Sequence, residues 1–394
     1  GAGYELESIQ YQPDALDARR GSGDASAAIV AFRPAGPERG PAAADAQAIQ
    51  DAMRSGIAAV IAARGEPVGE DRAGVAGLEA LGAERILSSL VSSEGVPSVD
   101  LFMHHLDRAL REPGRSGIRR VDEDGRAQYS LRNADAGAVP PLDDRVEWTV
   151  WGLLSAARGD DTFGFLRRAY AMFPSVLTPG RELVEGCLAS YGVRDPEGRW
   201  ALRPEDSLDR RQADQTAVLA ALIDAGRRMG FEVAVGRDLE GRQLAPPHGG
   251  QRLADLVPRR DPAVLGRVIE APPEVADAVD CVWHGRGGMV FIWQVDWTAR
   301  LHRSVVALGE AIRDDIRTFR FLAIADQRHD LLAYKLRRSP KLRELVARRA
   351  WRFVGWEPLR RLAESPCASL ADLEPILGLK TAMEQPRHQT VFHW

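Results

Sequence analysis

Lysine is nearly absent from this chain of 394 residues. Only Lys335, Lys341 and Lys380 occur among 52 basic residues, so arginine carries almost all of the positive charge. The net charge of −4 excludes a uniformly basic surface of the kind that coats a nucleic acid. Any surface that binds an anionic partner must therefore be local.

Cysteine and long apolar runs are also scarce. Cys187, Cys281 and Cys367 are odd in number and far apart, which excludes a disulfide framework and the paired spacing of a structural zinc site. The sequence shows no charged leader with an apolar run, and no stretch of about 18 apolar residues. We expect a cytoplasmic protein without a membrane partner. The opening Gly1-Ala2-Gly3, without methionine, is typical of a cleaved tag on a piece of a longer protein.

An internal repeat occupies the middle of the chain. Each copy is an amphipathic helix followed by a strand, a turn with Asp and Gly, and a second strand, which predicts a β-hairpin. Gly125-Arg126 in the first copy corresponds to Gly198-Arg199 in the second. Likewise 129–132 (Tyr-Ser-Leu-Arg) corresponds to 200–203 (Trp-Ala-Leu-Arg).

Helices followed by such a hairpin resemble winged helix-turn-helix modules. The resemblance implies that the last helix enters a DNA groove and that the hairpin touches backbone phosphate. Arginine is the residue type that phosphate contact requires. The candidate nucleic-acid contacts of the hairpins are Arg119, Arg120, Arg126 and Arg199. The alternative is a module that only docks proteins or acts as a spacer, because its helices carry mixed charge.

The pattern changes from residue 210 onward. Helical and strand periodicities alternate in the order αβββαβ and then αβα, which predicts a mixed sheet flanked by helices. The strands are expected at 231–236, 278–283, 289–298, 319–325 and 352–356. The helices are expected at 213–229, 301–316, 327–349 with a break near Pro340, and 358–364.

Polar residues mark matching positions on two of these expected strands. Asp280 lies on the second strand, and Gln294-Val295-Asp296 lies on the third, where alternation puts Gln294 and Asp296 on one face. This arrangement resembles the PD-(D/E)XK nuclease superfamily, which has Asp on the second core strand and (Asp/Glu)-x-Lys on the third. The resemblance implies catalytic roles for Asp280, Gln294 and Asp296. It also implies that Asp280 and Asp296 hold a Mg²⁺ that polarises phosphate and activates water.

The sequence departs from the superfamily pattern at two of these positions. Gln294 replaces a carboxylate and is a weaker Mg²⁺ ligand, while Asp296 stands where lysine is usual. Asp214 or Gln215 on the preceding helix could supply a further ligand. We expect the fold to survive and the hydrolytic site to be degenerate, because the apolar alternation and not the ligands builds the core. For either acid alone, the alternative is a structural carboxylate satisfied by a backbone N–H or an arginine.

A strongly basic run covers residues 335–361. It contains ten basic residues and two acids, which gives a local charge of +8 within a chain of −4. Such a run is usually a solvated face, but this imbalance beside tryptophans also suits phosphate contact. The candidate nucleic-acid contacts in it are Lys335, Arg337, Arg338 and Lys341.

These patterns predict a multidomain α+β and α/β protein. We expect an N-terminal hairpin, linker and helix over 1–70, winged-helix-like modules over 71–140 and 141–209, a restriction-endonuclease-like mixed αβββαβ domain over 210–366, and a tail over 367–394.

The first hypothesis for function is a DNA-binding protein with a degenerate nuclease-like domain. The segment 279–298 also resembles a C-terminal domain of bacterial DNA methyltransferase-like and restriction-associated proteins. That resemblance implies restriction-modification or phage defence in bacteria, with a methyltransferase or helicase subunit as possible partner. The second hypothesis is an active Mg²⁺-dependent endonuclease. The third is a protein-assembly module without DNA contact.

Overall fold

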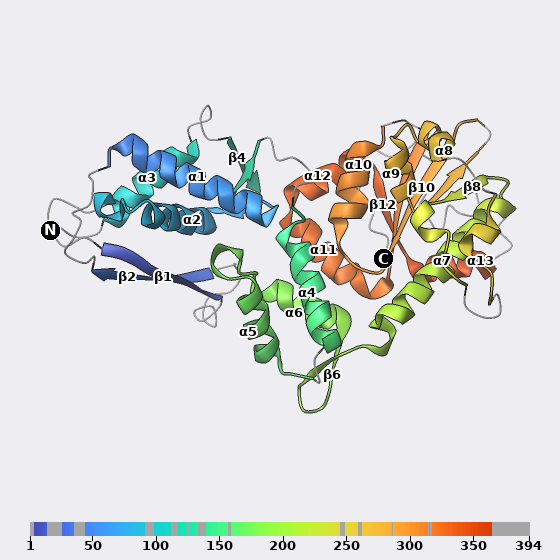
Figure 1. Cartoon of the computed structure of the whole chain (residues 1–394), viewed down its shortest axis with the longest axis horizontal. Helices are drawn as coiled ribbons and strands as arrows, with labels where there is room; N and C mark the ends of the chain where they lie inside the picture. Colours follow the sequence, from blue (N-terminus) through green and yellow to red (C-terminus); the bar gives the residue numbers. More distant parts are fainter. Residues whose placement is uncertain are drawn as a thin grey trace. The chain divides into compact units, whose positions relative to one another are not determined.

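The computed structural model describes residues 4–13, 26–34, 44–90, 98–111, 117–123, 126–132, 139–156, 159–244, 249–258, 262–285, 287–313, 315 and 317–364. Helices and small sheets are mixed in it (Figure 1). Two compact units share the chain, Gly1–Val150 with Asp161–Glu185, and Trp151–Asp160 with Gly186–Trp394. The predicted mixed, multidomain class is therefore confirmed, and the five finer segments stay a prediction.

The first unit begins with the predicted hairpin. Strand β1 (Tyr4–Pro13) pairs antiparallel with β2 (Ser26–Pro34). The next element is α1 (Ala46–Arg64), whose N-cap Asp45 accepts the Ala48 N–H at 2.7 Å. The helix ends at Gly65, which has φ of +66° and lies so close to Val139 O that a side chain would not fit. Both ends of this helix are thus set by residues of the local sequence.

A three-stranded sheet completes this unit. The predicted hairpin of β4 (Ile118–Glu123) and β5 (Arg126–Leu131) forms, and the two-residue strand β3 (Val68–Gly69) adds to the outer edge of β5. Strand β3 was not predicted, because two residues carry no period. The helices beside the sheet are α1, α2 (Glu70–Ala83) and α3 (Val99–Arg111).

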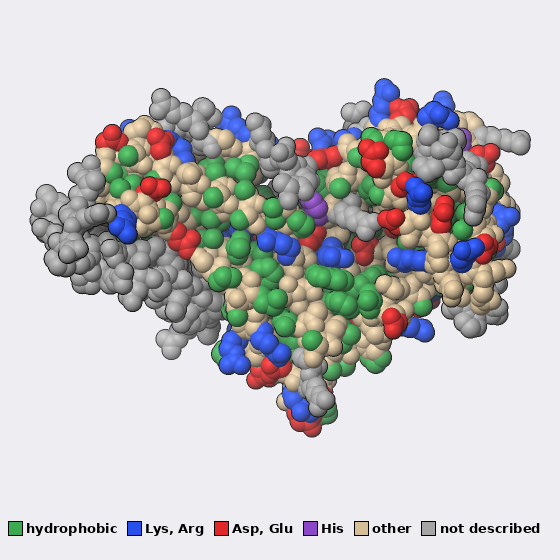
Figure 2. Space-filling view, in the orientation of Figure 1, with side chains coloured by type: hydrophobic (Ala, Val, Ile, Leu, Met, Phe, Trp, Pro, Cys, Tyr) green, Lys and Arg blue, Asp and Glu red, His purple; other side chains and the backbone are tan. Residues whose placement is uncertain are grey.

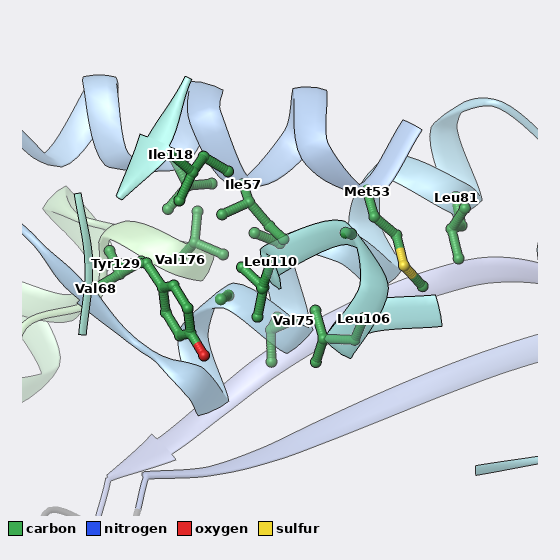
Figure 3. Packing of buried hydrophobic residues seen from close by; sticks show 14 of the residues in the cluster. Met53, Ile57, Val68, Val75, Leu81, Leu106, Leu110, Ile118, Tyr129 and Val176 are labelled. Carbon is green, nitrogen blue, oxygen red and sulfur yellow. The ribbon is translucent and has the colours of Figure 1, made fainter. Parts of the chain in front are cut away.

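One hydrophobic core joins these elements. Met53 and Ile57 of α1, Val68 of β3, Leu106 of α3 and Tyr129 of β5 are all buried in it (Figure 3). Helix α1 and strand β3 therefore belong with the helices and hairpin that follow them.

The second copy repeats this order of elements. An extended residue, Asp160, forms a bridge with Trp200 of β7, as β3 pairs with β5 in the first copy. The predicted hairpin 192–202 is confirmed, with β6 antiparallel to β7. The elements are α4 (Leu142–Ala156), α5 (Thr162–Met172), η3 (Ser175–Leu177), α6 (Arg181–Tyr191), β6 (Gly192–Arg194) and β7 (Trp200–Leu202).

The second unit contains a five-stranded mixed sheet, as the sequence predicted. Its order is β12-β11-β10-β9-β8, with β8, β9 and β10 antiparallel and β10, β11 and β12 parallel. Helix α7 (Leu208–Arg228) precedes it. The strands are β8 (Glu232–Val235), β9 (Cys281–His284), β10 (Val290–Asp296), β11 (Thr318–Ile324) and β12 (Trp351–Gly355).

Alternation along β10 separates an aromatic face from a polar one. Trp293 stacks on Phe321 with ring centroids 4.4 Å apart and lies 4.9 Å from Trp283. Trp283 packs against α7, where a Cβ at Gly226 would lie 2.7 Å from its Nε1. The intervening residues of β10, including Gln294, therefore face away from α7.

The remaining helices connect and cover the strands. Pro272 and Pro273 start helix α9 (Pro273–Ala278), so β9 begins at Cys281, three residues later than predicted. The helix expected over 301–316 is a π-helical turn, η7 (His302–Ala307), followed by α10 (Leu308–Ala311). The break near Pro340 is confirmed between α11 (His329–Arg338) and α12 (Pro340–Arg348). The other short elements are η4 (Pro204–Asp206), η5 (Arg237–Leu239), η6 (Leu253–Leu256), α8 (Pro262–Val268), η8 (Asp326–Arg328) and α13 (Trp356–Glu364).

Within the described ranges, no helix combines the length and the apolar character needed to cross a membrane.

Candidate functional site

The predicted acids lie at one edge of the sheet, where β10 ends and β9 begins. The pairing of Trp293 with Cys281 puts Asp280 opposite Gln294 on the neighbouring strand. Asp296 follows Gln294 by two residues at the end of β10. The structure thus brings the sequence-predicted positions together on adjacent strands.

The Asp280 side chain accepts a hydrogen bond from the backbone. Its Oδ2 accepts the N–H of Val295 at 2.7 Å, and its own carbonyl accepts the N–H of Gly236 at 3.2 Å. The half-buried carboxylate therefore extends the ladder between β9 and β10 beyond the last paired residues. This is the structural role that the sequence left open as the alternative.

Asp296 closes the turn after β10. Its Oδ1 accepts the backbone N–H and the hydroxyl of Thr298, both at 2.8 Å, and its Oδ2 accepts the Ser304 hydroxyl at 3.5 Å. Gln294 is 3% exposed, and its Nε2 donates to Ala278 O at 3.3 Å.

Helix α7 and the segment after β8 also reach this edge. The Gln215 side chain donates from Nε2 to Val295 O, and its Oε1 accepts from Arg242 Nη1 at 2.7 Å. Gln215 was one of two helix residues that the sequence offered as an extra ligand. The Arg242 guanidinium was missed, because it lies in a polar insert with no recognisable motif. Its guanidinium lies on the Gln215 side chain, which in turn contacts the end of β10.

The donor set at this edge does not fit a Mg²⁺ site. Both carboxylates accept hydrogen bonds from nearby backbone or hydroxyl groups, and the residue opposite Asp280 is the neutral amide Gln294, a weaker Mg²⁺ ligand than a carboxylate. In the part of the chain that the structure describes, no three His, Cys, Asp or Glu side chains gather closely enough to share a metal.

The neighbouring thiol is equally unsuited to chemistry. Burial, and then the charge of Asp280, raises the pKa of the Cys281 thiol far above its ordinary range. A thiol that stays protonated is neither a nucleophile nor a metal ligand.

The hairpin arginines are held by carboxylates of their own hairpins. Exposed Arg120 pairs with Asp122 at 2.7 Å, and this hydrogen bond and charge raise the pKa of Arg120. Exposed Arg199 pairs with Asp195 at 2.9 Å and with Glu197 at 3.5 Å. Arg119 is exposed on β4, and the side chain of Arg126 lies outside the described residues. Much of the positive charge of the hairpins is therefore neutralised locally.

The basic run divides into buried and exposed residues. Lys335 is 2% exposed and its Nζ donates to Ala299 O at 3.1 Å, so it does not belong to a binding surface. Arg337 and Arg338 are exposed at the end of α11, and the side chain of Lys341 lies outside the described residues. On α12 the exposed arginines are Arg343 and Arg348. Helical periodicity read from Leu331, Leu332 and Leu336 would have placed Lys335 on the buried face.

The helix before each hairpin is not basic. The exposed acids Asp100 and Asp107 of α3 balance its exposed Arg108 and Arg111, and α6 carries Glu182 and Glu185 against Arg181. On the face shown in Figure 2, Lys and Arg side chains are interspersed with Asp and Glu. A groove-reading role for these two helices gains no electrostatic support.

A buried ionic cluster links the second hairpin with the five-stranded sheet. The Asp206 carboxylate is fully buried and accepts from Arg211 Nε at 2.8 Å and from Arg328. The Arg328 guanidinium also lies 3.6 Å from the centre of the Tyr191 ring and donates to Trp297 O at 3.1 Å. Sequence reasoning missed this cluster, since its members are distant in the chain and each looks like a surface charge.

No family model, curated protein or solved structure matches this chain.

Proposed function

We propose that this chain binds duplex DNA without cutting it, through a domain that keeps a nuclease-like fold. The order of α7, β8, β9, β10, β11 and β12, with β10 parallel to β11, supports a PD-(D/E)XK-like core. The position of Asp280 opposite Gln294 supports it further. The repeated order of helix, short strand, two helices and hairpin likewise supports winged-helix-like modules.

The absence of cleavage is supported by the use of the site residues. Asp280 holds the N–H of Val295, and Asp296 holds Thr298 and Ser304. A Mg²⁺ ion would have to displace these hydrogen bonds, and it would find Gln294 where a second carboxylate is usual. The retained acids thus act as supports of the fold.

The observation that carries DNA binding is the exposed arginine cluster of α11 and α12. Arg337, Arg338, Arg343 and Arg348 are all exposed there. The exposed acids on the same two helices are Asp330 and Glu344. Guanidinium groups bind phosphate oxygens through two parallel hydrogen bonds, and each phosphate neutralised releases counterions from the duplex.

Fluorescence anisotropy of a labelled duplex tests this proposal. The double variant Arg337→Ala/Arg338→Ala should weaken binding and reduce the slope of log affinity against log salt by about two. The matched control is Arg120→Ala/Arg199→Ala, which removes the same charge from hairpins that neutralise it themselves. Equal losses in both variants, or binding indifferent to salt, would contradict the proposal.

A second candidate function is protein docking by the first winged-helix-like module. The observation that favours it is on α3, where Val99 is 73% and Met103 42% exposed, one turn apart. Its partner could be a methyltransferase or helicase subunit of a restriction or phage-defence system, as the resemblance implies. The remaining alternative, an active endonuclease, requires Mg²⁺- or Mn²⁺-dependent cleavage that Asp280→Ala abolishes.

A further inference from the structure

A polar cavity lies in the second unit at the carboxyl ends of β11 and β12. Its volume is about 450 Å³, within the range of small-molecule sites. The first turns of α7 supply Arg210, Arg211 and Asp214, and α13 supplies Trp356 and Arg360. The cavity lies at the same end of the sheet as Asp280, since β10 and β11 are parallel, but neither Asp280 nor Asp296 lines it, and it does not include the exposed arginines of α11 and α12.

The charges of this cavity balance one another. Asp214 lies between two guanidinium groups, 3.5 Å from Arg210 and 3.6 Å from Arg360. Arg211 is neutralised from behind by the buried Asp206 at 2.8 Å. Glu205 and Asp326 bring the described lining to three carboxylates and three guanidinium groups. A bare phosphate or a divalent cation would meet both signs, so the lining favours a neutral ligand with donors and acceptors.

Flat cationic groups form one wall. The guanidinium carbons of Arg211 and Arg360 each lie over the Trp356 ring, 5.9 Å from its centre. Trp356 is 1% exposed, whereas the Arg360 side chain is 41% exposed. A ligand therefore meets the Arg360 guanidinium and neither the indole nor Arg211, whose side chain is 3% exposed. Nucleobases stack on such guanidinium planes.

Donors and acceptors lie beside this wall. The Gln327 Oε1 accepts from Arg211 Nη2 at 3.1 Å, which leaves the amide nitrogen as a donor toward the cavity. The Asp326 Oδ2 accepts the N–H of Glu357 at 3.1 Å, and its Oδ1 is a further acceptor. The carboxylate can lie this close to β12 because position 355 is glycine, where a Cβ would overlap Oδ1. An amide donor beside a carboxylate acceptor matches the mixed edge of a base.

We propose that this cavity takes one nucleobase, stacked on Arg360 and read by Asp326 and Gln327. The inference rests on the proposed DNA binding for its source, a nucleotide turned out of the bound duplex. A free nucleoside offers the same ring and edge. The two sources are separated by experiment.

Two titrations of the full chain test the proposal. The first is calorimetry with adenosine, guanosine, cytidine and thymidine. The second follows 2-aminopurine fluorescence in a duplex, since this base brightens when it leaves the stack. Arg360→Ala should weaken either response about tenfold, as loss of one charged contact does. Arg361→Ala is the matched control, because Arg361 is the next residue of α13 and does not line the cavity.

A conservative variant distinguishes a change in binding from a loss of folding. Asp326→Asn can still accept the Glu357 N–H, but it presents a different pattern of donors and acceptors to the cavity. It should keep the unfolding temperature and change which nucleoside binds best.

The outcomes separate this inference from DNA binding itself. An increase in 2-aminopurine fluorescence that Arg360→Ala removes supports both the base-binding cavity and the proposed DNA binding. Nucleoside binding without duplex binding supports the cavity and overturns the proposed function. Duplex binding without a fluorescence increase and without nucleoside binding overturns the proposed base binding and leaves the proposed DNA binding standing. Equal effects of Arg360→Ala and Arg361→Ala would also overturn it.

Discussion

The Oδ2 atom of Asp280 accepts the backbone N–H of Val295 at 2.7 Å. An acid at the position of a metal ligand is thereby made part of the hydrogen bonding between β9 and β10. The same holds at the end of β10, where Asp296 accepts both donors of Thr298. Both acids at this edge of the sheet therefore take part in the hydrogen bonding of the fold.

Substitution of Asp280 should therefore affect stability. Asp280→Ala leaves the Val295 N–H without its acceptor and should lower the free energy of unfolding by about 1–3 kcal/mol, while Asp280→Asn should cost less. Urea denaturation measures both. The control Asp238→Ala, an exposed acid of η5, should stay within about 0.5 kcal/mol. Unchanged stability of Asp280→Ala would refute the structural role.

The buried cluster around Asp206 should be far more sensitive. Asp206→Ala leaves Arg211 and Arg328 buried without their shared carboxylate, and should cost about 3–5 kcal/mol. Asp195→Ala removes a carboxylate from an exposed pair with Arg199, so its cost should be much smaller. The comparison uses denaturant unfolding of the second unit within the full chain. Similar losses of unfolding free energy in the two variants would contradict a buried ionic cluster around Asp206.

The first unit should lose stability in mild acid because of His105. Burial, followed by the charges of His104 and Arg108, lowers the pKa of His105 below its ordinary 6.5. The unfolded chain then binds the proton more readily, so stability is present above about pH 6.5 and falls as the pH drops toward the folded pKa. His105→Leu should remove this part of the pH dependence, and His104→Gln, at an exposed position, should keep it. Parallel pH profiles for wild type and His105→Leu would contradict the assignment.

The close approach of α7 to the sheet should depend on Gly226. Alanine there would meet Trp283 at 2.7 Å and Val233 at 2.8 Å, so Gly226→Ala should destabilise by about 1–3 kcal/mol. Gly152→Ala is the matched control, since a Cβ in α4 meets nothing within 4 Å, and it should stabilise by up to about 1 kcal/mol. Thermal unfolding distinguishes the two signs.

The elements predicted well are those whose signal is local. Hairpins with Asp and Gly turns and the break near Pro340 depend on residues adjacent in the chain. The order of strands in the second unit followed from their apolar alternation. Strand β3 and the bridge at Asp160 were not predicted, because one or two extended residues show no hydrophobic periodicity.

The site could be placed but not interpreted from the sequence. Asp280 and Asp296 were put on neighbouring strands, yet their hydrogen-bond partners depend on register and on turns such as that at Thr298. Arg242 reaches the edge from an insert. Lys335 was predicted on the surface from the net charge of the basic run, although its position on the helix places it among buried leucines.

We propose that the chain binds duplex DNA and leaves it intact. This proposal is tested most directly by incubating the wild-type chain with a labelled duplex in Mg²⁺ or Mn²⁺ and resolving bound, free and cut DNA on paired native and denaturing gels. We expect a shifted band that weakens steeply with salt, and full-length strands in every lane. Cut strands that disappear in Asp280→Ala, or no shifted band at low salt, would contradict it.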